Sequence, residues 1–124
     1  MNAFTEDEVK YLRSGLLGRL ATVGRDGTPH IAPVGFSYNA DLGTIDVGGR
    51  DMAHTKKFRD VARSGRAAFV VDDVLPPWRP RGIEIRGRAE ALGEPRPLIR
   101  LHPERVISWG IGDNVTRRKG RSVE

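Results

Sequence analysis

The chain has 124 residues, which is enough for one domain of ordinary size, and its 38% hydrophobic and 30% charged residues are typical of a folded globular protein. It contains no cysteine, which excludes disulfides, thiolate zinc sites, iron–sulfur clusters and cysteine nucleophiles. The net charge is +5, which suits an anionic ligand, and no apolar run approaches the length of a membrane span.

The N-terminal segment is expected to form a short amphipathic helix. Thr5 and Glu8 have the spacing of a capping box, in which each side chain bonds the other residue's backbone N–H. Apolar residues then recur at helical spacing until Gly15, so the pattern predicts a helix over residues 5–14. Because this acidic start lacks the basic and apolar regions of a secretory signal, we expect a cytoplasmic protein without membrane association.

Strands and turns are predicted after this helix. Residues 16–24 favour a strand, and the Asp-Gly pair within residues 25–28 is typical of a hairpin turn. The next strand is predicted over residues 30–38, and Pro33 indicates an edge, a bulge or an open side there because proline cannot donate a hydrogen bond. The elements that follow are a turn over residues 40–43 and a strand over residues 44–48.

Strands and one further helix are predicted in the second half of the chain. The pattern predicts a helix over residues 53–63, strands over 66–72, 82–91 and 105–109, a proline-rich connection over 75–81 and a crossover over 95–102. We therefore expect one domain over residues 1–112 and a basic, flexible tail over residues 113–124. About six strands and two short helices, joined mostly by hairpins, predict a mainly β fold with a closed or half-closed antiparallel barrel.

A candidate phosphate site lies where the strand over residues 44–48 ends and the next helix begins. The residues concerned are Gly48, Gly49, Arg50, Thr55, Lys56 and Lys57. Glycines allow a ligand to approach the backbone, and a helix start offers unpaired N–H groups with a partial positive charge. The same lysines are also compatible with a solvated helix face. The segment has neither the P-loop pattern nor a dinucleotide-binding glycine fingerprint.

Two further motifs accompany this site, Asp26-Gly-x-Pro29 and Pro33-Val-x-Phe36. With the lysine at position 57, their order resembles the short, deazaflavin-dependent (coenzyme F420) branch of the pyridoxamine-phosphate-oxidase-like superfamily over roughly residues 5–110. The resemblance implies an FMN-binding type of split β-barrel that works as a homodimer. That branch commonly has Asn where this chain has Asp60, and we expect Asp60 to face a neighbouring arginine such as Arg63. A true pyridoxamine-phosphate oxidase is longer, so that activity is not expected.

The resemblance also implies a position for the cofactor, in a groove between two subunits. Its phosphate would meet Lys56 and Lys57, with Thr55 and Arg50 nearby. Its ring would lie against two stretches of chain, formed by Pro33, Val34, Gly35 and Phe36 and by Val47, Gly48 and Gly49. The partner subunit would complete the groove, with Trp78 and Trp109 as candidates. The sequence identifies no catalytic acid or base.

The implied function is that of an F420-dependent oxidoreductase, in which a hydride passes between the deazaflavin and a small organic substrate. FMN is the alternative cofactor, and a non-catalytic flavin or F420 carrier of the same fold is the alternative function. A nucleic-acid-binding barrel is disfavoured because aromatic and basic residues do not interleave on one strand face. The histidines at 30, 54 and 102 lack ligand spacing, so no metal site is expected.

Overall fold

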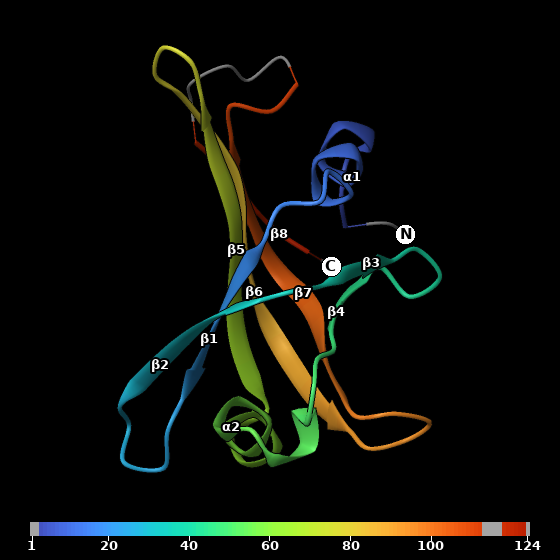
Figure 1. The fold of residues 1–124 in the computed structure, drawn as a ribbon. Helices are drawn as coiled ribbons and strands as arrows, with labels where there is room; N and C mark the ends of the chain where they lie inside the picture. Colours follow the sequence, from blue (N-terminus) through green and yellow to red (C-terminus); the bar gives the residue numbers. More distant parts are fainter. Residues whose placement is uncertain (1–2, 113–117, 124) are drawn as a thin grey trace.

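The computed structural model describes residues 3–112 and 118–123, and within them it contains eight strands and two short α-helices (Figure 1). The strands are β1 (Gly18–Val23), β2 (Pro29–Val34), β3 (Ser37–Asn39), β4 (Thr44–Val47), β5 (Arg66–Leu75), β6 (Arg79–Leu92), β7 (Leu98–Trp109) and β8 (Lys119–Ser122). The helices are α1 (Glu6–Leu12) and α2 (Lys56–Ser64), with a 3₁₀ turn over Met52–His54. Neither α-helix is long and apolar enough to cross a lipid bilayer.

All paired strands are antiparallel, in the order β2-β1-β5-β6-β7-β4-β3, and β8 pairs with the same edge of β7 as β4, farther along that strand. β2 and β3 stand at opposite ends of this order, yet only Gly35 and Phe36 separate them in the chain. The sheet therefore curls so that the two strands at its ends, β2 and β3, are directly connected by the chain. In Figure 1 these two strands form one continuous cyan line. This arrangement is a split barrel, which confirms the predicted mainly β fold.

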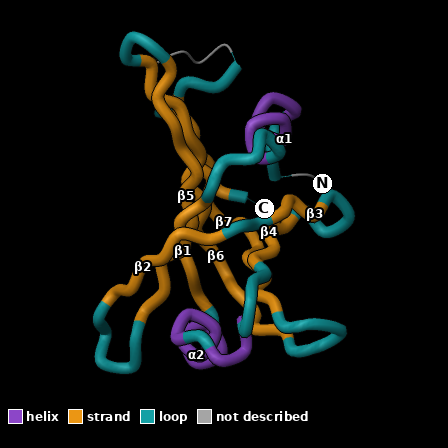
Figure 2. Tube along the Cα trace, viewed as in Figure 1, coloured by secondary structure: helices purple, strands orange, loops and turns teal. Residues whose placement is uncertain are grey.

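The core fills the inside of the barrel with the inward residues of each strand, as the alternation of side chains along a strand requires. The largest fully buried side chains are Phe69, Leu20, Ile45, Ile83, Ile85, Ile99 and Leu101. The helices lie at opposite ends of the strands (Figure 2). α1 adds buried Tyr11 and Leu12, and α2 adds Val61.

Both helices begin and end through the local signals of the sequence. Thr5 and Glu8 form the predicted capping box, with Glu8 N–H 3.2 Å from Thr5 Oγ1 and Thr5 N–H 2.9 Å from Glu8 Oε1. α2 begins at Lys56, three residues later than predicted, because the 3₁₀ turn comes first and Thr55 is the N-cap. It ends at Gly65, whose φ of 69° belongs to the left-handed region that glycine favours.

The predicted crossover over residues 95–102 is wrong. Leu98–Trp109 forms one long strand that pairs with β6 along its whole length. In the sequence, Pro103 interrupts the strand pattern of this segment. In the structure this residue lies at a β-bulge opposite Gly87. A Cβ at Gly87 would lie 2.0 Å from the carbonyl oxygen of His102, so this bulge needs glycine. The predicted proline-rich connection is also shorter, because β5 and β6 extend into it and leave a tight hairpin turn.

Two more sequence predictions need correction. The single strand predicted over residues 30–38 is broken at Gly35 and Phe36, where the chain passes from one end of the sheet to the other. The predicted flexible tail is wrong for residues 119–122, which form β8 and place Arg121 opposite Val106. The earlier part of that segment, residues 113–117, lies outside the described residues.

Candidate functional site

The start of α2 presents backbone N–H groups that are not used inside the helix. The Thr55 hydroxyl accepts a hydrogen bond from Phe58 N–H at 3.2 Å and donates one to the Met52 carbonyl at 2.7 Å. That hydroxyl is therefore used for capping. The backbone N–H groups of Lys56 and Lys57, in the first helical turn, have no acceptor inside the helix and point outwards with the positive end of the helix dipole.

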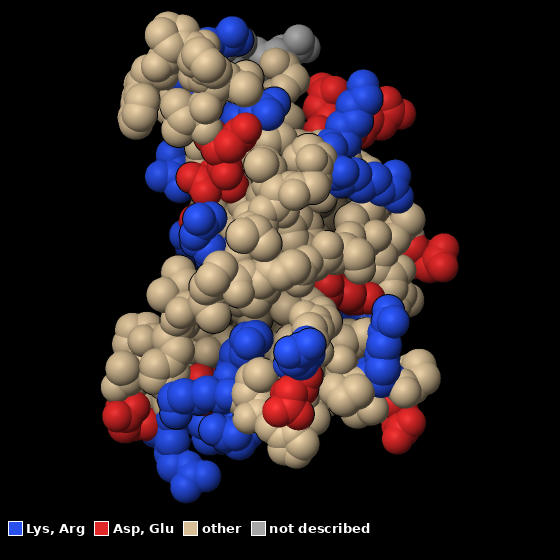
Figure 3. Space-filling model, in the orientation of Figure 1, with Lys and Arg blue, Asp and Glu red and all other residues tan. Residues whose placement is uncertain are grey.

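Positive charge surrounds this helix start. Among the described residues, Arg50, Lys56 and Lys57 have no carboxylate within salt-bridge distance. Further along α2 the arginines are engaged, because Arg59 donates to the His54 carbonyl at 3.0 Å and Arg63 donates to the Val23 carbonyl. Figure 3 shows basic side chains gathered over the end of the molecule where α2 lies. These three cations make no ion pair among the described residues, although Lys56 also interacts with the charge of Asp60, and they favour an anionic ligand.

Asp60 lies on the opposite side of α2, turned into the protein. Its side chain is only 2% exposed. It accepts a hydrogen bond from Thr22 Oγ1 at 2.9 Å, bonds His30 Nδ1 at 2.9 Å, and has Arg63 Nη1 at 3.5 Å. The expected approach of Arg63 is confirmed. The sequence missed Thr22 and His30 because they come from the β1–β2 hairpin, far from α2 in the chain.

The environment of Asp60 keeps it ionised. Burial alone raises the pKa of this carboxyl, but the hydrogen bonds with His30 and Thr22 and the nearby charge of Lys56 outweigh burial and hold the pKa below its ordinary value. Asp60 is therefore a charged anchor between α2 and the β1–β2 hairpin. Its carboxylate is occupied inside the protein and does not compete with an anion at the helix start.

The glycines near β2 and β4 leave space for a ligand. Gly35 and Gly48 have no atom within 4 Å of the position where a Cβ would stand. Val34 and Val47, by contrast, are 6% and 0% exposed, so Val47 offers no surface to a bound molecule and Val34 offers very little. β2 ends the strand order, which leaves the backbone groups on its second edge without a strand partner among the described residues.

Two cavities flank the short link between β2 and β3. One, of about 440 Å³, includes Ser37, Gly48, Gly49 and Arg96 in its lining. The other, of about 430 Å³, includes Gly35, Phe36, Ser37 and Tyr38. Both volumes are in the range of small-molecule sites. Phe36 is held in place by an edge-on contact with Phe69, with 4.8 Å between ring centroids.

Asp46 also lines the cavity beside Gly48, and its charge is balanced within the protein. Arg100 makes two hydrogen bonds of 3.0 Å to the carboxylate, and Asn39 and Thr44 donate at 3.0 and 2.9 Å. Burial raises the pKa of Asp46, but these four bonds outweigh it and hold the pKa low. Arg96, in contrast, has no carboxylate partner among the described residues, which leaves this cavity with an uncompensated positive charge.

The two tryptophans do not join this site within one chain. Trp78 is 75% exposed at the tip of the β5–β6 hairpin, and Trp109 ends β7 opposite Gly82. That hairpin tip lies at the end of the strands away from α2 (Figure 1). The Arg118 guanidinium lies 4.7 Å above the Trp109 ring. The expected contact of either tryptophan with a cofactor therefore depends on a second subunit.

The outer face of the sheet carries an apolar patch that the sequence pattern did not reveal. Ile31 is 70% exposed in the middle of β2, and its cross-strand neighbour Ala21 pairs in turn with Ala68 of β5. Val23, on the same face of β1, is 44% exposed. A cavity of about 250 Å³ beside Ile31 extends over this face to Trp109. Contiguous exposed apolar surface of this kind is typical of an interaction site.

Comparisons with known proteins agree with this architecture. A family profile described as pyridoxamine 5'-phosphate oxidase matches residues 4–121. The chain is 46% identical, over 132 aligned positions, to a 5a,11a-dehydrotetracycline/5a,11a-dehydrooxytetracycline reductase of Streptomyces rimosus, and the alignment covers 97% of this chain and 93% of that protein.

Solved structures share the fold at low sequence identity. A conserved hypothetical protein of Mycobacterium tuberculosis matches with a TM-score of 0.74 at 23% identity, over 87% of this chain and 86% of that one. A protein described as an F420 reductase matches with a TM-score of 0.65 at 22% identity, over 83% and 98% of the two chains. An FAD-binding protein of Mycobacterium smegmatis matches with a TM-score of 0.65 at 20% identity, over 99% and 100%.

Proposed function

The chain belongs to the pyridoxamine 5'-phosphate oxidase family, and from this membership we propose that it is an oxidoreductase subunit that binds the deazaflavin coenzyme F420. The relative that shares 46% of its sequence is a reductase, which favours reduction of an organic substrate over the alternative of a non-catalytic carrier. The similarity to an F420 reductase supports the deazaflavin, and the similarity to FAD-binding proteins keeps FMN as the alternative cofactor.

The residues of the site fit a planar ring joined to a phosphate. Lys56 and Lys57, with the N–H groups of the α2 start, would hold the phosphate, and Arg50 adds a third charge. The open space at Gly35 and Gly48 would admit the ring against the backbone. A bound reduced deazaflavin supplies the hydride, which is chemistry that no side chain of the protein provides.

The substrate class follows from the reductase relative. The name of that protein specifies dehydro compounds, which contain a carbon–carbon double bond that reduction saturates. For this chain we infer an electron-poor double bond, in which one carbon receives the hydride and the other receives a proton from solvent. The role of the protein is to fix the ring and the substrate face to face, because orientation alone contributes several kcal/mol to such reactions, on the order of 7 or more.

A second copy of the chain would complete the site. The patch around Ile31 gives that copy an apolar surface to cover, and a stable interface requires about 800 Å² on each subunit. The exposed Trp78 on its long hairpin reaches away from its own α2, which suits a role in the groove of the partner. We propose a homodimer with the cofactor at the subunit boundary.

The observation that carries this proposal is the group of uncompensated cations at the start of α2. We expect Lys57→Ala to weaken F420 binding about tenfold, or about 1.4 kcal/mol, because it removes a charge from the phosphate. A fluorescence titration of the purified dimer with F420 measures the dissociation constant. The matched control is Arg25→Ala, which removes an exposed charge from the β1–β2 turn.

A parallel titration with FMN decides between the two cofactors. Oxidation of reduced F420 in the presence of an unsaturated ketone tests turnover, and tight binding without turnover would favour the carrier function. If neither ring system binds, or if Lys57→Ala and Arg25→Ala bind F420 as tightly as the wild type, the proposal is wrong.

A further inference from the structure

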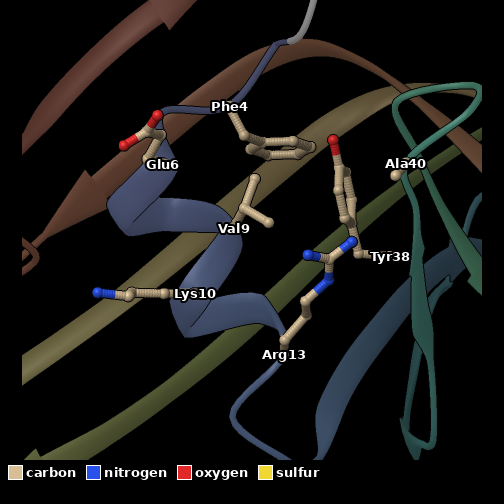
Figure 4. Close-up of a pocket in the computed structure, with 7 residues that line it drawn as sticks. All are labelled: Phe4, Glu6, Val9, Lys10, Arg13, Tyr38 and Ala40. Atoms are coloured by element: carbon tan, nitrogen blue, oxygen red, sulfur yellow. The ribbon is translucent and has the colours of Figure 1, made fainter.

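A cavity of about 500 Å³ lies between α1 and β3, away from the cations of α2 (Figure 4). Phe4, Val9 and Arg13 form its wall on the side of α1, and Tyr38 and Ala40 form the wall on the side of β3. Its volume is in the range of sites that enclose a small organic molecule. The role proposed above for the α2 region leaves this cavity without a ligand.

The cavity places two aromatic rings beside a cation. The Phe4 and Tyr38 rings meet edge-on with 5.7 Å between their centroids, and the Arg13 guanidinium lies 5.3 Å above the Tyr38 ring. Phe4 is 5% exposed, so it is held firmly by the protein. Figure 4 shows Arg13 reaching from the end of α1 towards Tyr38. Such a combination suits a planar aromatic molecule that carries an anionic oxygen.

The charge of Arg13 is available to a ligand. Among the residues that the structure describes, no carboxylate lies within salt-bridge distance of its guanidinium. Glu6 also lines the cavity, but its carboxylate points away from the Arg13–Tyr38 pair in Figure 4. The Lys10 side chain also extends away from this pair in Figure 4, so its charge and that of Glu6 both lie at the periphery. Arg13 is therefore the charged group of this lining that faces Tyr38, and it favours an anion.

The cavity also adjoins the expected position of the cofactor ring. Arg13 and Tyr38 line both this cavity and the neighbouring one of about 430 Å³ that contains Gly35 and Phe36. A molecule placed along Tyr38 would thus have one end at the link between β2 and β3, where the ring is proposed to lie. The two adjacent cavities offer more length than a single six-membered ring fills.

We propose that the cavity between α1 and β3 is the substrate site, and that it takes a planar polycyclic substrate with an acidic phenol or enol oxygen. Tyr38 packs against the rings, and Arg13 binds the ionised oxygen and so determines specificity. The inference rests on the proposed reductase function, because it assigns the substrate of that activity. It does not depend on the cations of α2, so the two ideas can fail separately.

The test uses two dyes of the same ring system. 1,2-Dihydroxyanthraquinone carries an acidic oxygen, whereas 2-(hydroxymethyl)anthraquinone has the same three rings without one. We expect the wild-type protein to bind the acidic dye, and Arg13→Gln to weaken that binding about tenfold while the neutral dye changes by less than about twofold. Absorbance titrations of the purified protein measure both dissociation constants. Arg13 is exposed at the end of α1, so the variant should fold.

Control variants separate the two sites. Arg25→Gln removes a charge at the distant β1–β2 turn and should leave both dyes unaffected. Lys57→Ala should weaken F420 binding and leave the acidic dye unaffected. The inference is overturned if the wild type binds neither dye, if Arg13→Gln has no effect, or if the acidic dye responds to Lys57→Ala instead. If Lys57→Ala weakens F420 binding while any of these results is obtained, the proposed cofactor site is still supported.

Discussion

Asp60 shows how a single buried charge connects distant parts of the chain. Its carboxylate lies between α2 and the β1–β2 hairpin, where it bonds Thr22 and His30. Burial raises its pKa, and the hydrogen bonds more than reverse that effect, so the pKa in the folded protein is below the ordinary value. A group with a depressed pKa stabilises the fold above its ordinary pKa, and this contribution disappears as pH falls through the lower, folded value.

We expect Asp60→Ala to lower the free energy of unfolding by about 2–3 kcal/mol at pH 7, since Thr22 and His30 lose their partner in a buried place. The difference from wild type should shrink as pH falls below the ordinary pKa of an aspartate, because the unfolded carboxyl is protonated first and the folded one only at its lower pKa. Urea denaturation at pH 7 and pH 3 measures both values. Asp60→Asn retains an acceptor oxygen and should cost less than Asp60→Ala. An equal loss at both pH values would contradict a role for the charge.

At the scale of elements, the C-terminal strand is attached to the N-terminal helix. Arg121 of β8 bonds Glu8 of α1, with 3.1 Å between Nη1 and Oε2, and also donates to the Ala3 carbonyl at 2.6 Å. Glu8 is a buried carboxylate whose pKa burial raises, but the bonds from Arg121 and from the Thr5 N–H outweigh burial and keep it low. The N-terminal helix and the C-terminal strand therefore stabilise each other beside β7.

Removal of the Arg121–Glu8 interaction should make α1 open more readily than the rest of the barrel. We expect Arg121→Met to raise the amide exchange rates of α1 about tenfold or more, while the rates of β6 stay close to wild type, because local openings differ across a structure. Hydrogen exchange followed by mass spectrometry measures this difference. Arg105→Met is the matched control, since Arg105 bonds Ser122 of β8 at 3.4 Å and makes no hydrogen bond to α1 among the described residues. Equal protection of α1 in both variants would show that the Arg121–Glu8 pair does not hold the helix.

At the scale of the whole molecule, the small barrel leaves one sheet face apolar and exposed. The patch around Ile31 crosses β2, β1 and β5, and alanines at positions 21 and 68 make it flat. A flat apolar face favours close contact with a second copy of the same face, as in a two-fold symmetric dimer. The proposed cofactor site depends on that dimer, because the β5–β6 turn and the end of β7, which carry Trp78 and Trp109, lie at the end of the strands away from α2.

A charge at the centre of this patch should prevent association. We expect the wild-type protein to be a dimer and Ile31→Lys to be a monomer, because a lysine there would be buried without a partner. Light scattering coupled to size-exclusion chromatography measures the mass of each. Leu42→Lys is the control, as Leu42 is 56% exposed in the β3–β4 turn and away from the patch. A monomeric wild type, or a dimeric Ile31→Lys, would place the interface elsewhere.

The sequence by itself determined the features that depend on neighbouring residues. The capping box at Thr5 and the Asp-Gly turn were both correctly predicted, because each is stabilised by contacts within a few residues. The same holds for the family resemblance, since its motifs lie in these turns and helix starts. Together they were enough to predict an antiparallel barrel, and the anion site at the start of α2 stays a prediction.

Only the tertiary structure decided the features that depend on distant partners. The first half of β7 is a strand because β6 and β4 pair with it, and β8 is a strand because β7 pairs with it. The cavity beside Tyr38 and the partners of Asp60 arise where segments far apart in the chain meet. A strand edge or a cavity wall is stabilised by whatever lies across from it, and local propensity contains no information about that partner.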